Sequence, residues 1–424
     1  MRTSIPTTLA LAAWLALSGG TISARAAGSF PDLFAEDGHS PKAVKTKIDA
    51  AFAQLFHGDP REQAIFYLAG SNSDGPLGFV MDVASDDVRT EGMSYGMMIC
   101  VQLDHKTEFD AIWNWAKTFM YHDAPTNPSC GFFSWSMKTN GVANDEMVAP
   151  DGEEYFVTSL YFAANRWGSG SGIYDYHGEA DRLLSNMIHR AEITGQVAPK
   201  PGRPSKIRAG SLFNAEQKMI RFSPNLTDRD HTDPSYHLPA FYELWAQWGP
   251  AEDRAFCSDA ARISRDFFQR ATDPRTGLNP NYANFDGSPM APPWSPDTTN
   301  FLYDAWRTAM NWSVDWSWWG KDPREQELSD RLQAFFASKG IDTYGNQFTL
   351  DGSRQLADDH SKGLVAMNAV ASLAATNPRR KQFVEALWDT PVPHGHYRYY
   401  DGLLYLMGMM HCGGEFRVIQ PPIK

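Results

Sequence analysis

Two carboxylic acids stand where they could carry out acid–base chemistry. Glu91 opens an apolar segment rich in methionine. Apolar surroundings raise the pKa of a carboxyl group, so Glu91 could hold a proton near neutral pH and donate it. Asp304 precedes Arg307 by three residues, and a nearby guanidinium would keep that carboxylate ionised. One protonated and one ionised carboxyl form the pair that glycosidic hydrolysis needs.

Each of these residues also fits a structural role when it is taken alone. Glu91 could be an ordinary glutamate favoured by the dipole at a helix N-terminus. Asp304 and Arg307 could form a structural ion pair within one helix. Asp151 opens a third apolar segment, where it could bind sugar hydroxyls or cap a helix. The residue types alone leave both interpretations open.

The aromatic content is the most informative feature of the composition. The chain has 14 Trp, 16 Tyr and 25 Phe, together 13% of its residues. A large core would use many of them, and a plain aromatic core remains the alternative. The surplus of Trp and Tyr beside polar residues suggests platforms for sugar rings, because an amphipathic ring matches the apolar face of a pyranose.

Two kinds of helical segment alternate along the chain, and signals for strands are scarce. Six segments have a polar or glycine-containing lead followed by residues that are apolar nearly all round, as in fully buried helices. They are 91–99, 151–164, 235–244, 303–312, 363–373 and 400–409. Six others are amphipathic, with charged faces: 42–57, 105–121, 177–193, 252–271, 323–338 and 379–388.

This alternation predicts an all-α fold, an (α/α)6 toroid of six inner and six outer helices, with more than half of the chain helical. In such a ring the leads of the inner helices converge on one face, which would bring Glu91, Asp151 and Asp304 together. A bundle of two helical domains is the alternative. No Pro- or Ser-rich linker divides the chain, which favours one catalytic domain over 27–424.

The first 26 residues have the features of a secretory signal peptide. Arg2 precedes an apolar run, 9–17, and the sequence Ala24-Arg25-Ala26 fits a cleavage site. Nothing later is apolar over a length that could span a bilayer. We therefore expect a secreted protein, extracellular or periplasmic, without a membrane partner.

Charge and cysteine usage exclude several classes of function. The formal net charge is −12, and loss of Arg2 and Arg25 with the signal peptide would make it −14. An acidic surface disfavours nucleic acid and anionic membranes and suits a neutral substrate. The four cysteines show neither zinc-site spacing nor a disulfide framework. We expect no metal, no cofactor and a monomer.

Several segments, in this order along the chain, resemble glycoside hydrolase family 8. The similar segments are Arg89–Met98, Pro150–Phe156, Asp233–Pro239, Tyr303–Arg307, Gly363–Ala369 and Tyr397–Gly402. Together they cover nearly the whole chain after the signal peptide. The resemblance implies an (α/α)6 barrel and an inverting mechanism.

The resemblance also implies roles for individual residues. Glu91 would be the general acid and Asp304 the general base, while Asp151 would bind and distort the sugar at the cleavage point. The remaining candidates would hold water, orient Asp304 or contact the substrate, and they are Tyr236, Arg307, Trp135, Tyr303, His360 and Tyr400.

Within the family, the segments 151–155 and 397–402 are most similar to xylan-active members. Some of those release xylose from the reducing end and carry a Leu-His-Pro loop. Here His360 lacks the flanking Leu and Pro. We therefore predict an endo-1,4-β-xylanase, with reducing-end xylose release as the alternative. A β-1,4-glucanase, a non-catalytic carbohydrate-binding toroid and a polysaccharide lyase are further alternatives.

Overall fold

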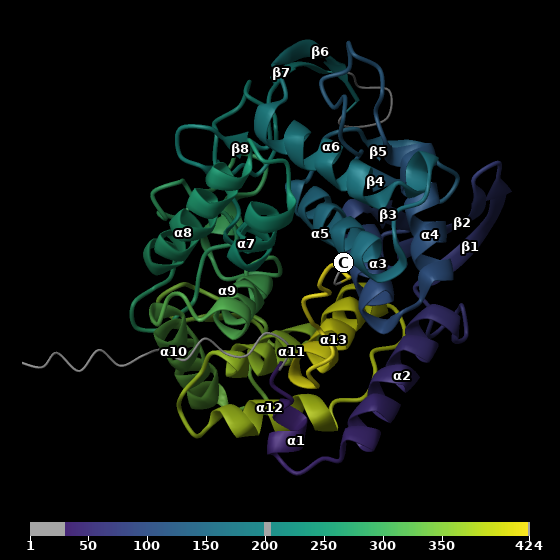
Figure 1. The fold of residues 1–424 in the computed structure, drawn as a ribbon. Helices are drawn as coiled ribbons and strands as arrows, with labels where there is room; N and C mark the ends of the chain where they lie inside the picture. Colours follow the sequence, from purple (N-terminus) through teal and green to yellow (C-terminus); the bar gives the residue numbers. More distant parts are fainter. Residues whose placement is uncertain (1–29, 199–204, 423–424) are drawn as a thin grey trace, which may run out of the picture.

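The computed structural model describes residues 30–198 and 205–422, so the predicted signal peptide lies outside the described residues (Figure 1). About 48% of the structure is helical, which is below the predicted value of more than half. The difference comes from short strands and long connections between the helices, which the periodicity of the sequence does not reveal.

Six buried helices match the six apolar segments. Each contacts the next one along the chain, and the last contacts the first (Figure 1). They are α3 (Thr90–Leu103), α5 (Pro150–Trp167), α7 (Pro239–Trp248), α9 (Trp306–Trp319), α11 (Lys362–Val370) and α13 (Arg398–Cys412). These helices carry apolar side chains on nearly every face, so they can be packed on all sides.

Six amphipathic helices each pack against one buried helix, with α2 on α13, α4 on α3, α6 on α5, α8 on α7, α10 on α9 and α12 on α11. They are α2 (Pro41–His57), α4 (Lys106–Trp115), α6 (Tyr176–His189), α8 (Arg254–Ala271), α10 (Arg324–Lys339) and α12 (Arg380–Asp389), and a short α1 (Leu33–Glu36) precedes them. The pairing follows the predicted alternation of buried and amphipathic segments.

The strands are the main feature that the sequence did not predict. An antiparallel sheet is formed by β1 (Phe66–Asn72), β2 (Gly75–Asp82), β3 (Asp87–Arg89), β4 (Ser136–Met137) and β5 (Ala143–Asp145). Two-stranded pairs are β6 (Ile193–Val197) with β7 (Ser205–Ala209), β8 (Phe213–Asn214) with β9 (Met219–Ile220), and β10 (Gln347–Phe348) with β11 (Gln355–Ala357). Strand β3 leads directly into α3, so the sheet fixes where Glu91 stands.

Two buried helices begin later than the sequence indicates. Helix α7 starts at Pro239, because a residue before proline disfavours helical backbone, and Tyr236 lies in a preceding 3₁₀ turn, Pro234–Tyr236. Helix α9 starts at Trp306, and Asp304 lies in the turn before it. Both functional candidates are therefore at helix entrances rather than inside helices.

Most buried apolar side chains form one cluster that extends from Leu33 to Phe416. A second, small cluster is formed by buried residues of β6 and β7, with Met147 packed against them. Among the described residues, no helix is long and apolar enough to cross a membrane.

Candidate active site

Arg307 lies at the centre of the predicted carboxylates. Its Nη1 donates hydrogen bonds to Oε2 of Glu91 at 3.0 Å and to Oδ2 of Asp151 at 2.8 Å. Its Nη2 donates to Oδ1 of Asp304 at 3.1 Å. The guanidinium side chain is only 2% exposed. Three carboxylates from α3, α5 and the turn before α9 are thus gathered around one buried cation.

The sheet and a close helix contact position Glu91. The backbone N–H of Thr90, the first residue of α3, donates to the carbonyl oxygen of Trp135 at 3.0 Å. Trp135 directly precedes β4, so this hydrogen bond joins the start of α3 to the sheet. Gly152 of α5 faces the same residue, and a Cβ at Gly152 would lie 2.4 Å from Cβ of Thr90. Only glycine allows α5 to approach this closely, so Asp151 and Glu91 come within reach of one guanidinium.

Burial sets the protonation of Glu91. Its side chain is 16% exposed, and burial raises its pKa to about 7, helped by the negative charges of Asp151 and Asp304. Arg307 opposes this rise but does not cancel it. A carboxyl with this pKa holds its proton in slightly acidic solution, as a general acid requires.

Tyr399 is a site residue that the sequence did not single out, although its neighbour Tyr400 was. The Tyr399 hydroxyl donates to Oε1 of Glu91 at 2.9 Å. Gly92 makes room for the ring, because a Cβ there would lie 2.5 Å from Cε2 of Tyr399. Tyr399 and Tyr400 are neighbours in α13, so their side chains point in different directions. The sequence pattern of α13 does not show which of the two contacts Glu91.

Asn281 is a second missed residue, and it holds Asp304. Its Nδ2 donates to Oδ2 of Asp304 at 2.9 Å, and its Oδ1 accepts from the backbone N–H of Asp304 at 3.0 Å. The Asp304 side chain is 30% exposed, so a water molecule can reach it. Asn281 lies in a loop without periodicity, and no local pattern relates it to a residue 23 positions later.

Tyr236 lies against the same guanidinium. Its ring is centred 6.0 Å from Cζ of Arg307, and its neighbour Ser235 accepts a hydrogen bond from Nη2 of Arg307 at 3.0 Å. Burial raises the pKa of Tyr236 well above its usual value, so its hydroxyl is neutral and can donate. The 3₁₀ turn before α7 therefore contributes two side chains to the site.

Three further predicted aromatic residues lie around these groups. Trp135 is partly exposed, with the guanidinium of Arg89 5.7 Å from its ring centre. Tyr303 is half exposed, and its carbonyl oxygen accepts a hydrogen bond from the Tyr400 hydroxyl at 2.9 Å. The rings of Tyr303 and Tyr400 both contact Trp306, so they form one partly exposed aromatic group beside Asp304.

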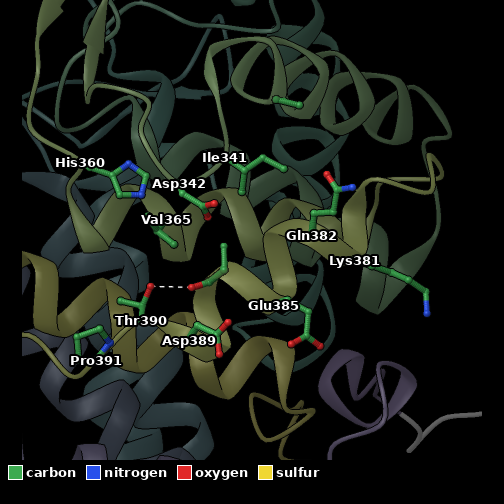
Figure 2. Close-up of a pocket in the computed structure, with 12 residues that line it drawn as sticks. Ile341, Asp342, His360, Val365, Lys381, Gln382, Glu385, Asp389, Thr390 and Pro391 are labelled. Carbon is green, nitrogen blue, oxygen red and sulfur yellow. Dashed lines mark hydrogen bonds between the residues drawn. The ribbon is translucent and has the colours of Figure 1, made fainter.

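His360 is placed differently from the other candidates. Its Nδ1 lies 2.9 Å from the carbonyl oxygen of Tyr344 and donates to it. Figure 2 shows His360 on the wall of a cavity of about 790 Å³ between α10, α11 and α12. The cavity is lined by Ala337, Ile341, Asp342, His360, Val365, Lys381, Gln382, Glu385, Ala386, Asp389, Thr390 and Pro391. Glu91, Asp151, Asp304 and Tyr236 thus lie around Arg307, whereas the contact of His360 is with Tyr344 and its side chain lines this cavity.

The carboxyls that follow Asp151 have structural environments. Glu153 accepts from the backbone N–H of Phe133 at 3.0 Å, and burial raises its pKa to about 8. Glu154 accepts from the Tyr242 hydroxyl at 2.5 Å, and burial raises its pKa well above the usual value. The helix α5 is preceded by Ala149, without a side-chain cap, so Asp151 does not act as an N-cap.

Comparisons with known proteins agree with this site. The model of the family Glycosyl hydrolases family 8 matches residues 72–414. The chain is 39% identical to the reducing-end xylose-releasing exo-oligoxylanase Rex8A of Paenibacillus barcinonensis over 392 residues, covering 92% of this chain and 97% of that protein. A similar exo-oligoxylanase of Halalkalibacterium halodurans is also 39% identical, over 92% of this chain and 95% of the relative.

Among solved structures, a family 8 xylanase from Teredinibacter turnerae is 54% identical and superimposes with a TM-score of 0.90, covering 93% of this chain and 99% of that one. It has been solved with xylobiose and, as a catalytic mutant, with xylohexaose. With the family model spanning most of the chain and the predicted carboxylates gathered on one arginine, this chain belongs to glycoside hydrolase family 8 and is a glycoside hydrolase.

Proposed function

We propose that the chain hydrolyses β-1,4-xylosidic bonds in xylan or xylooligosaccharides, with inversion of the anomeric carbon. The observation that carries the proposal is the gathering of Glu91, Asp151 and Asp304 around Arg307. The choice of a xylose polymer is supported by the names of the similar proteins and by the xylooligosaccharides in the Teredinibacter turnerae complexes.

Glu91 is the proton donor in this mechanism. Below its pKa of about 7 it carries a proton, which it transfers to the glycosidic oxygen as the bond to the anomeric carbon breaks. Tyr399 and Arg307 each hold one oxygen of the carboxyl group. The departing sugar therefore leaves as a neutral alcohol, and Glu91 becomes a carboxylate beside the guanidinium.

Asp304 is the base that activates water. The partly exposed carboxylate accepts a proton from a water molecule, which attacks the anomeric carbon on the face opposite to the leaving group. Glu91 and Asp304 bond to different nitrogens of the same guanidinium, so Arg307 holds the two acids near each other without direct contact between them. Inverting enzymes separate their carboxyls by roughly 6.5–9.5 Å, which leaves room for this water.

Asp151 and Tyr236 hold the reacting sugar and the water. Asp151 is buried and accepts from both Arg307 and the backbone N–H of Gly152, so its orientation is set before the substrate binds. Its carboxyl group suits hydroxyls of a distorted sugar ring, and the neutral Tyr236 hydroxyl suits the attacking water. These contacts strengthen as the oxocarbenium-like transition state forms.

The wider context of the chain is part of the same proposal. The closed sequence of contacts among six buried helices, each covered by one amphipathic helix, supports an (α/α)6 toroid. A single catalytic domain over 27–424, secretion after removal of residues 1–26, and a monomeric state remain our proposals from the sequence.

Two modes of cleavage fit the proposed reaction: release of xylose from the reducing end, and cleavage of internal bonds. The relatives from Paenibacillus barcinonensis and Halalkalibacterium halodurans are named for release of xylose from the reducing end, which supports that mode better than the internal cleavage that we predict. Internal cleavage is supported by the absence of Leu and Pro beside His360 and by the name xylanase of the Teredinibacter turnerae protein.

Product analysis tests both the proposed reaction and the position of the cleaved bond. The enzyme is incubated with xylohexaose, polymeric xylan and cellohexaose, and products are separated by chromatography while NMR records the first anomer formed. Hydrolysis of xylohexaose to inverted products supports the proposed reaction, and mixed oligomers from the polymer support internal cleavage. Xylose and xylopentaose alone would select reducing-end release, and cleavage of cellohexaose alone would refute the xylan proposal.

A further inference from the structure

Trp294 is a large apolar side chain left open to solvent near the site. It is 61% exposed, in a loop between Met290 and the short 3₁₀ helix Pro296–Thr299. Single exposed apolar residues are common on protein surfaces, so the exposure alone carries no function. The surroundings of Trp294 distinguish it from the other exposed apolar side chains.

An aromatic path connects Trp294 to the catalytic groups. The centre of its ring system lies 5.7 Å from that of Phe222 and 5.8 Å from that of Tyr282. Phe222 in turn stacks on Tyr236, with the rings 6.0 Å apart and 5° from parallel. Trp294 is therefore two ring contacts away from the residue that lies over Arg307.

The chain beside Tyr282 gives a second connection to the same centre. Asn281, the preceding residue, holds Asp304 through two hydrogen bonds. The charge of Asp304 also contributes to the raised pKa of Tyr282, after burial as the main cause. Tyr282 thus lies between the catalytic base and Trp294.

The loop that carries Trp294 is held at both ends. The backbone N–H of Met290 donates to the carbonyl oxygen of Tyr282 at 2.9 Å, and the N–H of Tyr282 donates to the carbonyl oxygen of Thr298 at 3.0 Å. The Thr298 hydroxyl donates to the carbonyl oxygen of Met290 at 2.9 Å. A tryptophan that is exposed on an anchored loop offers a preformed flat surface, and little entropy is lost when a ligand stacks on it.

We propose that Trp294 forms an outer subsite, in which its indole stacks on a xylopyranose unit at least two units away from the cleaved bond. The inference rests on the proposed xylosidic activity, because the aromatic path extends from that catalytic centre. A xylose ring lacks the hydroxymethyl group and offers a flat apolar face to an indole. The subsite would bind long substrates better than short ones.

The test compares chain-length dependence in matched variants. We expect Trp294→Ala to lower kcat/KM for xylohexaose about 3- to 10-fold, the value of one aromatic stacking contact, with a clearly smaller loss for xylotriose. Trp294→Phe should recover most of the loss. Leu68 is a similarly exposed apolar residue on β1. Leu68→Ala should leave unchanged the ratio of kcat/KM for xylohexaose to kcat/KM for xylotriose.

Binding gives a readout that does not depend on turnover. In the Glu91→Gln background, calorimetry with xylohexaose should show weaker binding when Trp294→Ala is added, by a similar factor. Equal affinity with and without Trp294→Ala, or equal losses on xylotriose and xylohexaose, would overturn the subsite. Failure of the unmodified enzyme to cleave any xylooligosaccharide would instead overturn the proposed function, and the binding comparison would still decide on Trp294.

Discussion

Glu91 lies between one cation and two other acidic side chains, and its burial decides which influence dominates. Arg307 favours the carboxylate, whereas burial, Asp151 and Asp304 favour the protonated acid and raise the pKa to about 7. Asp304 is more exposed and is held by Asn281. Two carboxyls bonded to one guanidinium therefore occupy different environments, as acid and base roles require.

Removal of either carboxyl should abolish most of the activity without unfolding the protein. Glu91→Gln and Asp304→Asn are each expected to lower kcat by about 10²–10⁴-fold, the usual contribution of one general acid or base. Turnover of xylohexaose and far-UV circular dichroism provide the measurement. Glu216→Gln, at an exposed loop position, is the control and should remain active. Near-normal turnover in either site variant would reject its assignment.

The hydrogen bond from Tyr399 should tune the proton donor. A hydroxyl that donates to a carboxylate stabilises the charged form, so Tyr399→Phe should raise the pKa of Glu91. The acid must be protonated to act, so activity of the unmodified enzyme should fall above about pH 7, and this alkaline limb should move to higher pH in the variant. The measurement is the pH profile of kcat/KM. An unmoved alkaline limb would show that Tyr399 has no effect on the acid.

At the scale of elements, the close contact between α3 and α5 brings Glu91 and Asp151 to one arginine. The contact depends on Gly152, whose missing side chain leaves space for Thr90. The sheet β2–β3–β4 sets the entry of the chain into α3, because Arg89 is paired with Ser136 in register. The spacing of Glu91 and Asp151 therefore depends on the packing of the α3 and α5 backbones.

Gly152→Ala should disturb both stability and catalysis. The added Cβ would lie 2.4 Å from Cβ of Thr90, so the helices must separate, at a cost of about 1–3 kcal/mol. We expect a lower free energy of unfolding in urea and a lower kcat. Gly170→Ala is the matched control, because its nearest neighbour would be 3.3 Å away and solvent is close by. Equal stability of the two variants would contradict the role given to Gly152.

At the scale of the whole molecule, buried ion pairs join helices that are neighbours along the chain. Arg265 of α8 donates two hydrogen bonds to Asp315 of α9, at 2.6 and 2.8 Å, and lies 2.9 Å from Glu243 of α7. All three side chains are nearly inaccessible to solvent. The pairs therefore connect α7, α8 and α9.

Asp315→Asn should destabilise the molecule as a whole. The buried Arg265 keeps Glu243 as a partner but loses its bidentate carboxylate, and weakening charged hydrogen bonds in this way costs about 1–3 kcal/mol. Urea unfolding followed by fluorescence should show a lower midpoint, whereas Asp49→Asn, which removes an exposed pair with Lys45, should change little. An unchanged midpoint in Asp315→Asn would mean that the pair is not needed for stability.

The sequence alone was sufficient to predict the two sets of helices and the grouping of Glu91, Asp151 and Asp304. Hydrophobic periodicity is a local property, and residues three and four positions apart lie on one face of a helix. For that reason the twelve segments agree with α2 to α13 to within a few residues at most ends. Asp304 and Arg307 were paired for the same local reason, and they are in contact at 3.1 Å.

Only the tertiary structure decided which distant residues meet. Tyr399 reaches Glu91 across 308 positions, Asn281 approaches Asp304 from an aperiodic loop, and His360 lies in a separate cavity. Strand β3, just before Glu91, pairs on one side with the nearby β2 and on the other with β4, which follows α4 in the chain. Such contacts depend on the packing of the whole molecule, because no local spacing or propensity encodes the distance between residues that are remote in the sequence.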